Sequence, residues 1–158
     1  MNVDLEVEAF KGNTKLEKVV LSNGAKSIGA SAFQGCTNLN YVYIPKTVQT
    51  IALAGSFNIT PVFGDTNINC PIVVNEKNQR YCVEGNCLID KQTNSVISGF
   101  LDSQIPNWVE SISGYAFAGL TNLTSINIPS SVKKLGSYSF SDCNNLTDIY
   151  IEDLSSWC

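Results

Sequence analysis

The stretch Ile28–Ile51 reads I-G-A-S-A-F-Q-G-C-T-N-L-N-Y-V-Y-I-P-K-T-V-Q-T-I, and its pattern of apolar residues recurs along the chain. The same frame surrounds five phenylalanines, the third of them in a modified copy: Phe10, Phe33, Phe57, Phe117 and Phe140. The first two and the last two of these are each 23 residues apart. A fixed period of this length is typical of solenoids, in which each repeat covers the hydrophobic face of its neighbour.

Each regular repeat contains the pattern L-x-x-V/I-x-I/L, in which buried and outward positions alternate. In the second copy this period of two predicts a strand with Val42 and Ile44 buried and Tyr43 facing outward. Pro45 ends the strand, because proline cannot donate a hydrogen bond to a neighbouring strand. The segment I-G-x-x-A-F-x-x-C has helical spacing over a very short stretch, so we expect a short helical or 3₁₀ corner there.

Stacking of the repeats is expected to place equivalent side chains in columns, with strands about 4.8 Å apart. Besides the phenylalanines, a leucine column and a β-branched column are predicted: Leu16, Leu39, Leu123 and Leu146, and Val19, Val42, Ile126 and Ile149. We assign these columns to the hydrophobic core, since one contiguous core needs such residues in such positions.

Residues 75–104 interrupt the frame and are predicted to form a β-hairpin insertion within the third repeat. The turn residues Glu84-Gly85-Asn86 lie between two apolar stretches, which is typical of a hairpin. A second turn at Asp90–Asn94 leads to Val96–Phe100, so three short strands are expected. Two interpretations stay open: the insertion braces the array, or it protrudes and contributes to a contact surface.

Composition argues against several classes of function. The chain has 158 residues, of which 44% are hydrophobic and 15% charged, and this composition supports a packed core. The ten Lys and Arg residues are scattered and the net charge is −4, so we expect no binding of nucleic acid or of an anionic membrane. The chain has no histidine, which removes the commonest general base and most zinc sites. We therefore expect no enzymatic activity, no metal and no cofactor.

The sequence contains no evident membrane or secretion segment. No apolar run approaches the roughly 20 residues that span a bilayer, so no membrane insertion is expected. Acidic residues follow Met1 where a secretory signal would be basic and then apolar. Either the protein is intracellular, or a signal is absent from this form of the chain.

The six cysteines do not form a metal-binding pattern. Cys36 and Cys143 share the third position after a phenylalanine but lie in repeats that are not neighbours, so we expect two buried thiols. Cys82 and Cys87 face each other if Glu84-Gly85 is the centre of the hairpin turn, and the bonded and unbonded forms both stay open. Two further cysteines have no visible partner: Cys70 and Cys158.

The outward positions of the strands provide the candidate binding face. Stacking is expected to bring together the residues that flank each buried Val or Ile: Lys18, Val20, Tyr41, Tyr43, Ser125, Asn127, Asp148 and Tyr150. Tyrosine is enriched at interaction hot spots, because it offers contact area and a hydroxyl at low entropic cost. The candidate binding residues are therefore Tyr41, Tyr43, Asn127, Tyr150 and, as a further exposed aromatic, Trp108. The alternative is that the tyrosines only pack against neighbours on a solvated sheet.

The pattern I-x-x-x-A-F-x-x-C-x-x-L-x-x-I-x-I-P-x-x-V-x-x-I resembles the BspA-type leucine-rich repeat. The match is close over Leu5–Ile51 and Ile105–Ile151 and loose between them. Asn75–Phe100 is similar to a hairpin-bearing repeat of that family, and the tail I-E-D-L-S-S-W-C resembles a recurrent ending-type repeat. The resemblance implies a non-enzymatic surface protein of the kind often linked to adhesion, and no fixed binding motif accompanies it.

We therefore expect a right-handed leucine-rich-repeat solenoid of about five repeats that spans residues 1–158 as one domain and is a segment of a longer array. Its expected function is a binding module of a cell-surface or secreted protein that recognises a protein or a glycan. Its open end is also expected to favour end-to-end self-association. The alternatives are a structural spacer with no ligand of its own and, least favoured, a hydrolase.

Overall fold

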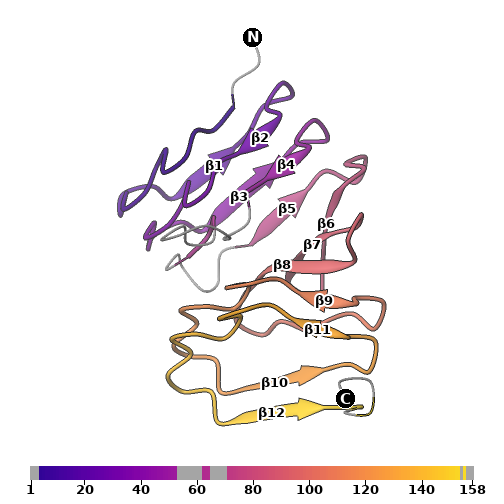
Figure 1. Ribbon diagram of the computed structural model, residues 1–158. Coiled ribbons are helices and arrows are strands. Elements are labelled where there is room, and N and C mark those ends of the chain that lie inside the picture. The colour runs from indigo at the N-terminus through magenta and orange to yellow at the C-terminus, as the bar shows by residue number, and fades with distance from the viewer. Residues whose placement is uncertain (1–3, 53–61, 65–70, 154, 156–158) are drawn as a thin grey trace. The chain divides into compact units, whose positions relative to one another are not determined.

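The structure is a computed structural model that describes residues 4–52, 62–64, 71–153 and 155. It divides into two compact units, Met1–Cys82 (unit 1) and Val83–Cys158 (unit 2). The described residues contain twelve β-strands and no α-helix (Figure 1). Three of the phenylalanine and cysteine positions named above lie outside the described residues: Phe57, Cys70 and Cys158.

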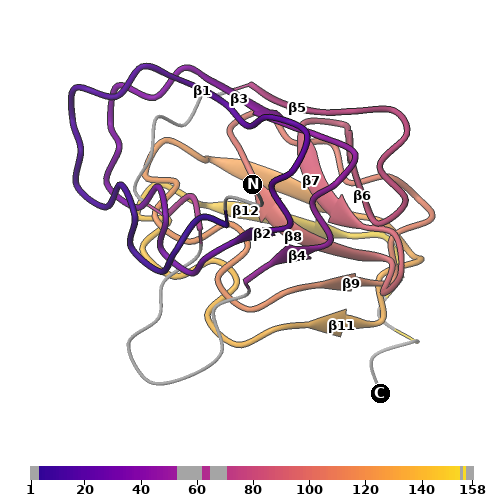
Figure 2. The ribbon, with the colours of Figure 1, turned by 90° about the horizontal axis from the view of Figure 1, so that it is seen from above.

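Unit 1 contains two parallel sheets. The strands of the first are β1 (Lys18–Val20), β3 (Tyr41–Ile44) and β5 (Ile72–Val74), and those of the second are β2 (Ser27–Ile28) and β4 (Thr50–Ile51). Val19, Val42 and Ile72 are in register across the first sheet and are buried, as the β-branched column predicts for the first two. The two sheets run along different sides of the coils, so each 23-residue repeat makes one turn of a stack (Figure 2).

Unit 2 combines repeat strands with the hairpin. Its parallel two-stranded sheet pairs β10 (Ser125–Ile128) with β12 (Asp148–Ile151). A second sheet, most of it in unit 2, has the order β11 (Lys134–Leu135), β9 (Ser111–Ile112), β8 (Ser95–Gly99), β7 (Cys87–Asp90) and β6 (Tyr81–Glu84). Strand β8 is parallel to β9 and antiparallel to β7, so it joins the repeat ladder to the hairpin.

The predicted helical corners are hydrogen-bonded turns. Ser31 and Gly35 flank Phe33 and both have positive φ, at 55° and 70°, which a right-handed helix does not permit. The Gln34 N–H donates locally to Ser31 O at 3.1 Å, whereas the Phe33 N–H donates to Val62 O of the next coil at 2.9 Å. Successive amides therefore alternate between local and inter-coil partners, and no helix forms.

The phenylalanine column confirms the repeat frame and corrects its third member. The Phe33 ring stacks on Phe10 at 5.9 Å and on Phe63 at 5.5 Å between centroids. Phe63 precedes Ile72 by the same nine positions that separate Phe33 from Val42. Phe63, which we did not predict, is thus the third member that we assigned to Phe57, because the seven extra residues of this repeat precede the phenylalanine and do not follow it.

In unit 2 a glycine takes the place of a phenylalanine in the corresponding column. Phe117 stacks on Phe140 at 5.2 Å. On its other side the Gly99 N–H donates to Ala116 O at 2.7 Å, the same bond that Phe117 N–H makes to Ser139 O one coil later. A Cβ on Gly99 would lie 2.0 Å from a ring carbon of Phe117. The ring of Phe117 therefore covers Gly99, and only glycine fits there.

The hairpin turn decides the question of the Cys82–Cys87 disulfide. Gly85 and Asn86 both have φ of 56°, as a two-residue type I′ turn requires. This turn is one residue later than Glu84-Gly85, so it places Glu84, and not Cys82, opposite Cys87. Both cysteines are accordingly thiols.

The two column cysteines are buried thiols, as predicted. The Cys36 thiol donates to Phe10 O at 3.1 Å, and the Cys143 thiol donates to Phe117 O at the same distance. Each thiol thus satisfies a carbonyl of the preceding coil. Desolvation by burial raises the pKa of both thiols, so both remain protonated at neutral pH.

Candidate functional site

The outward face of β1, β3 and β5 gathers large side chains in unit 1. In this sheet Lys18 is in register with Tyr41, and Val20 with Tyr43, which is in turn in register with Val73. The side chains alternate along each strand, so the residues beside buried Val42 point away from the core, as predicted. Tyr41 and Tyr43 are half-buried by their neighbours.

Both tyrosines of this face are held by a neighbour. The ammonium of Lys18 lies 5.0 Å from the ring centroid of Tyr41, a cation–π distance. The Tyr43 hydroxyl accepts a hydrogen bond from Asn75 Nδ2 at 2.8 Å. On either side of Tyr43, Val20 is 60% exposed and Val73 40% exposed. We call the row Val20–Tyr43–Val73 together with Tyr41 the tyrosine face; it offers apolar area beside the Tyr43 hydroxyl that Asn75 orients.

Unit 2 presents a more polar face on β10 and β12. Here Ser125 is in register with Asp148, and Asn127 with Tyr150, which is 61% exposed. The Asn127 Nδ2 donates to Glu152 Oε1 at 3.0 Å, and the Ser130 N–H donates to the other carboxylate oxygen at 3.0 Å. These two bonds lower the pKa of Glu152, so its charge persists into acid. The bond to Glu152 also fixes the side-chain amide of Asn127.

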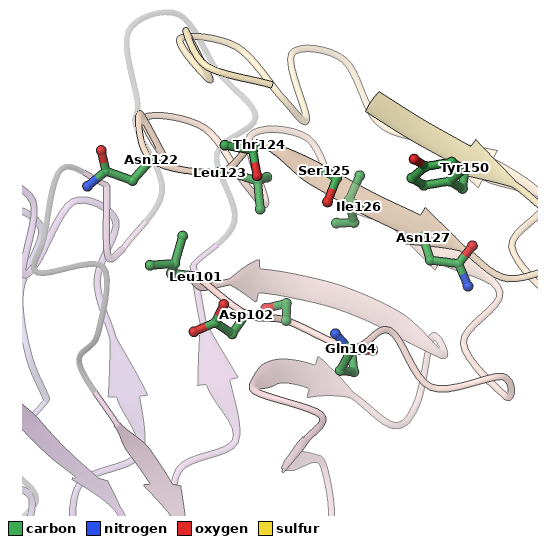
Figure 3. Close-up of a pocket in the computed structure, with 11 residues that line it drawn as sticks. Leu101, Asp102, Gln104, Asn122, Leu123, Thr124, Ser125, Ile126, Asn127 and Tyr150 are labelled. Atoms are coloured by element: carbon green, nitrogen blue, oxygen red, sulfur yellow. The ribbon is translucent and has the colours of Figure 1, made fainter. Parts of the chain in front are cut away.

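A pocket of about 380 Å³ lies beside β10, and its lining belongs entirely to unit 2 (Figure 3). Ser125 and Asn127 on β10, with Tyr150 on β12, form one wall, and Leu101–Gln104 forms the other (Figure 3). Asn122, Leu123 and Thr124 line it at the start of β10. The lining contains one carboxylate, that of Asp102, and no Lys or Arg.

The hairpin holds the second wall of this pocket in place. The Gln104 N–H donates to Gly85 O at 2.7 Å, and Asn86 Nδ2 donates to Leu101 O at 2.6 Å. Buried Ser103 accepts from the Phe100 N–H at 2.8 Å and donates to Asn86 O at 2.7 Å. All of these bonds lie within residues 75–104, so they fix the pocket wall to the hairpin and leave both interpretations of the insertion open.

The five predicted binding residues thus fall into three places. Tyr41 and Tyr43 share the tyrosine face of unit 1, and Asn127 and Tyr150 share the pocket of unit 2. Trp108 is half-buried, and its Nε1–H donates to Glu84 Oε2 of the hairpin at 3.1 Å. Trp108 does not line the pocket, so its contacts do not support the prediction that it belongs to the same binding face as the other four residues.

Sequence reasoning missed the residues of the second wall, Asp102 and Gln104. The sequence feature that could have indicated this wall is a shortened repeat. Gly99 precedes Ile105 by six positions, whereas its counterpart Phe117 precedes Ile128 by eleven. It also missed the stacked pair Tyr115 and Tyr138, whose centroids are 5.2 Å apart. Both tyrosines have positive φ and precede a column phenylalanine by two residues, as Ser31 does.

The acidic and cysteine side chains of the described part of the chain are possible metal ligands and nucleophiles. These residues contain no cluster of three or more His, Cys, Asp or Glu side chains that could hold a metal ion. Burial raises the pKa of Cys87 to about 11, which leaves this thiol protonated and a poor nucleophile at neutral pH. The described residues contain no helix that is long and apolar enough to cross a membrane.

Comparison with known proteins agrees with this architecture. The family model "BspA type Leucine rich repeat region" matches six copies over residues 3–72 and 97–157. No curated protein matches the chain in sequence.

Solved structures with the same fold include the pneumococcal vaccine antigen PcpA, with a TM-score of 0.66 at 19% identity. They also include a leucine-rich cell surface protein from Faecalibacterium prausnitzii, with a TM-score of 0.64 at 23% identity. The alignments cover 93% and 92% of this chain but only 42% and 44% of those proteins. The predicted leucine-rich-repeat fold is confirmed, and the chain spans less than half the length of these two relatives.

Proposed function

We propose that this chain, which belongs to the BspA-type leucine-rich repeat family, is a non-enzymatic binding module of a cell-surface or secreted protein. It recognises a protein or a glycan through the outward faces of its parallel strands. The related solved structures are those of a vaccine antigen and of a cell surface protein, which supports this assignment. The alternative is a spacer that has no ligand of its own.

The tyrosine face is the observation that carries the proposal. A spacer needs only small or polar side chains on a solvated sheet, because nothing is to be bound there. Here two half-exposed valines flank Tyr43, whose hydroxyl is already oriented by Asn75. Oriented aromatic side chains lose little conformational entropy on binding, and they are enriched among the residues that dominate interface energies.

The test is a binding screen of the chain against immobilised extracellular-matrix proteins and a glycan array. We expect saturable binding, and we expect the double variant Tyr41→Ser/Tyr43→Ser to weaken it at least about thirtyfold, since a hot-spot residue contributes about 2 kcal/mol or more. The matched control is Tyr138→Ser, which removes a 66% exposed tyrosine from a turn and should leave binding unchanged. Circular dichroism verifies that each variant is folded.

Two results would contradict the proposal. Absence of binding by the wild type to every surface would favour the spacer. Equal losses in Tyr138→Ser and in the double variant would show that exposed tyrosines act non-specifically. Binding that survives the double variant would keep the module but remove the site from the tyrosine face.

End-to-end self-association is a further part of the proposal. Core-column residues at the outer coils remain partly uncovered, since Phe10 is 39% exposed and Ile149 48% exposed. Unpaired strand edges beside such apolar residues favour contact with another chain. We expect sedimentation equilibrium of the wild type to show dimers whose fraction grows with concentration. Ile149→Lys should shift the population to monomer, whereas Thr147→Lys on the same coil should not, and a wild type that is monomeric throughout would refute this part.

A further inference from the structure

Strand β10 has a free edge that faces the pocket. It pairs with β12 on one side, and in the described part of the chain no strand pairs with its other side. An unpaired edge presents a row of backbone donors and acceptors to which another extended segment can add. This edge presents backbone N–H and C=O groups, whereas the tyrosine face presents side chains.

The register of unit 1 indicates which groups of β10 point into the pocket. In β3 the carbonyl of Tyr43 accepts from Leu21 N–H on the β1 side, and the N–H of Val42 donates to Pro71 O on the β5 side. Asn127 of β10 occupies the repeat position of Tyr43. Ile128 O of β10 accepts from the Glu152 N–H at 3.1 Å on the β12 side. Backbone groups alternate along a strand, so those of Ser125 and Asn127 point away from β12, toward the pocket.

In the described part of the chain, the coil that precedes β10 contributes no strand beside it. Six positions separate Gly99 from Ile105 in this coil, whereas eleven separate Phe117 from Ile128 in the next, so this coil is five residues shorter. Five residues of extended chain would span roughly 17 Å, the length of a short strand. Hydrogen bonds to the hairpin hold Leu101–Gln104, and no described strand takes this position. The pocket of about 380 Å³ corresponds to roughly two or three residues of extended chain, given strand and sheet spacings.

We propose that an extended peptide segment bearing a Lys or Arg side chain adds to the free edge of β10 and occupies this pocket. The N–H and C=O of Ser125 and Asn127 supply its backbone hydrogen bonds, as in other cases of strand addition. The carboxylate of Asp102, the only acidic side chain of the lining, selects a cationic side chain, and no Lys or Arg of the lining opposes it. The inference deepens the proposed function and rests on it for the premise that this chain binds a partner, but it does not require the tyrosine face to bind anything.

Amide hydrogen exchange, read by NMR on the full chain, tests this inference. In the free protein we expect the amides of Ser125 and Asn127 to exchange fast and those of Ile126 and Ile128 slowly. The probe is a pool of short synthetic peptides that alternate β-branched and polar residues around a central Lys, added at millimolar total concentration. We expect this pool to slow exchange at Ser125 and Asn127 by about tenfold or more. A matched pool with Glu in place of Lys, and a pool with N-methylated backbones, should have no effect.

Matched variants assign the effect to the strand edge. Ser125→Pro removes the pocket-facing N–H and should abolish the effect of the Lys pool, because proline has no backbone donor. If circular dichroism shows that Ser125→Pro does not fold, Asp102→Asn carries the test. Asn tolerates the positive φ of 62° at this position, and the variant should bind the Lys pool about two- to fivefold more weakly.

Three outcomes would overturn the inference: protection of Ser125 and Asn127 in the free protein, no slowing of their exchange by any peptide pool, or perturbation of the pocket by oligosaccharides but not by peptides. The last would assign the pocket to a glycan. None of these variants touches the tyrosine face, so a failure here is distinguishable from a failure of the proposed function.

Discussion

Replacing Phe33 with alanine is expected to lower the free energy of unfolding by about 3–5 kcal/mol, the usual cost of emptying a phenylalanine site in a packed core. Phe33 is fully buried and stacks between Phe10 and Phe63. Its removal opens a cavity between two rings that the coil backbones hold apart, so the site cannot collapse. Chemical denaturation of wild type and variant measures the difference.

Phe10→Ala is the matched control for this prediction. Phe10 belongs to the same column, but it is 39% exposed and its ring stacks on one other ring, that of Phe33. We expect a loss of less than about half that of Phe33→Ala, since less apolar area leaves water at this site. Equal losses for the two variants would contradict the assignment of Phe33 to the centre of the column.

Asn78→Leu is expected to destabilise the protein by at least about 3 kcal/mol, because each buried backbone group left without a hydrogen-bond partner costs about 1–3 kcal/mol. The Asn78 side chain is buried, and its Nδ2 donates to Pro45 O at 2.9 Å and to Val48 O at 3.0 Å. Its Oδ1 accepts from the N–H groups of Arg80 and Tyr81 at 2.9 and 2.8 Å. Leucine has a similar volume but can make none of these four bonds.

Asn75→Ala controls for the loss of an asparagine in the same turn. Asn75 Oδ1 accepts from the Lys77 N–H, and its Nδ2 donates to the Tyr43 hydroxyl, but the site is only half-buried. Water can replace these partners, so we expect a loss of about 1 kcal/mol or less. A loss at Asn75 as large as that at Asn78 would show that burial does not decide the cost.

The repeat frame could be predicted from the sequence because it follows from columns of identical side chains. The spacing of Phe10 and Phe33 was sufficient to place Val19 opposite Val42, and the parallel pairing of β1 with β3 confirms it. The corners could not be predicted, because helical spacing over so few residues does not distinguish a helix from a turn whose φ is positive at Ser31 and Gly35. The sequence alone predicts Phe57 in place of Phe63, because an insertion within a repeat can lie on either side of the shared residue.

The candidate site was less predictable than the fold. Alternation along a strand identified the outward positions of Tyr43 and Asn127, since it depends only on local sequence. The pocket forms because the coil from Gly99 to Ile105 contributes no strand beside β10. A missing strand has no residue pattern by which the sequence could predict the pocket. Its wall at Asp102 and Gln104 is positioned by hairpin contacts, such as the bond from the Gln104 N–H to Gly85 O, which join residues far apart in the sequence. The domain limits, 1–158 for the array and 75–104 for the insertion, stay predictions.

The most direct test of the central claim is a chemical-shift map of the isotope-labelled chain, titrated with the tightest ligand from the binding screen. The account predicts that the largest changes in unit 1 lie on the tyrosine face, at Tyr41 and along the row Val20–Tyr43–Val73. Changes concentrated instead at the turn around Ser31 and Gly35, with none on that row, would contradict it.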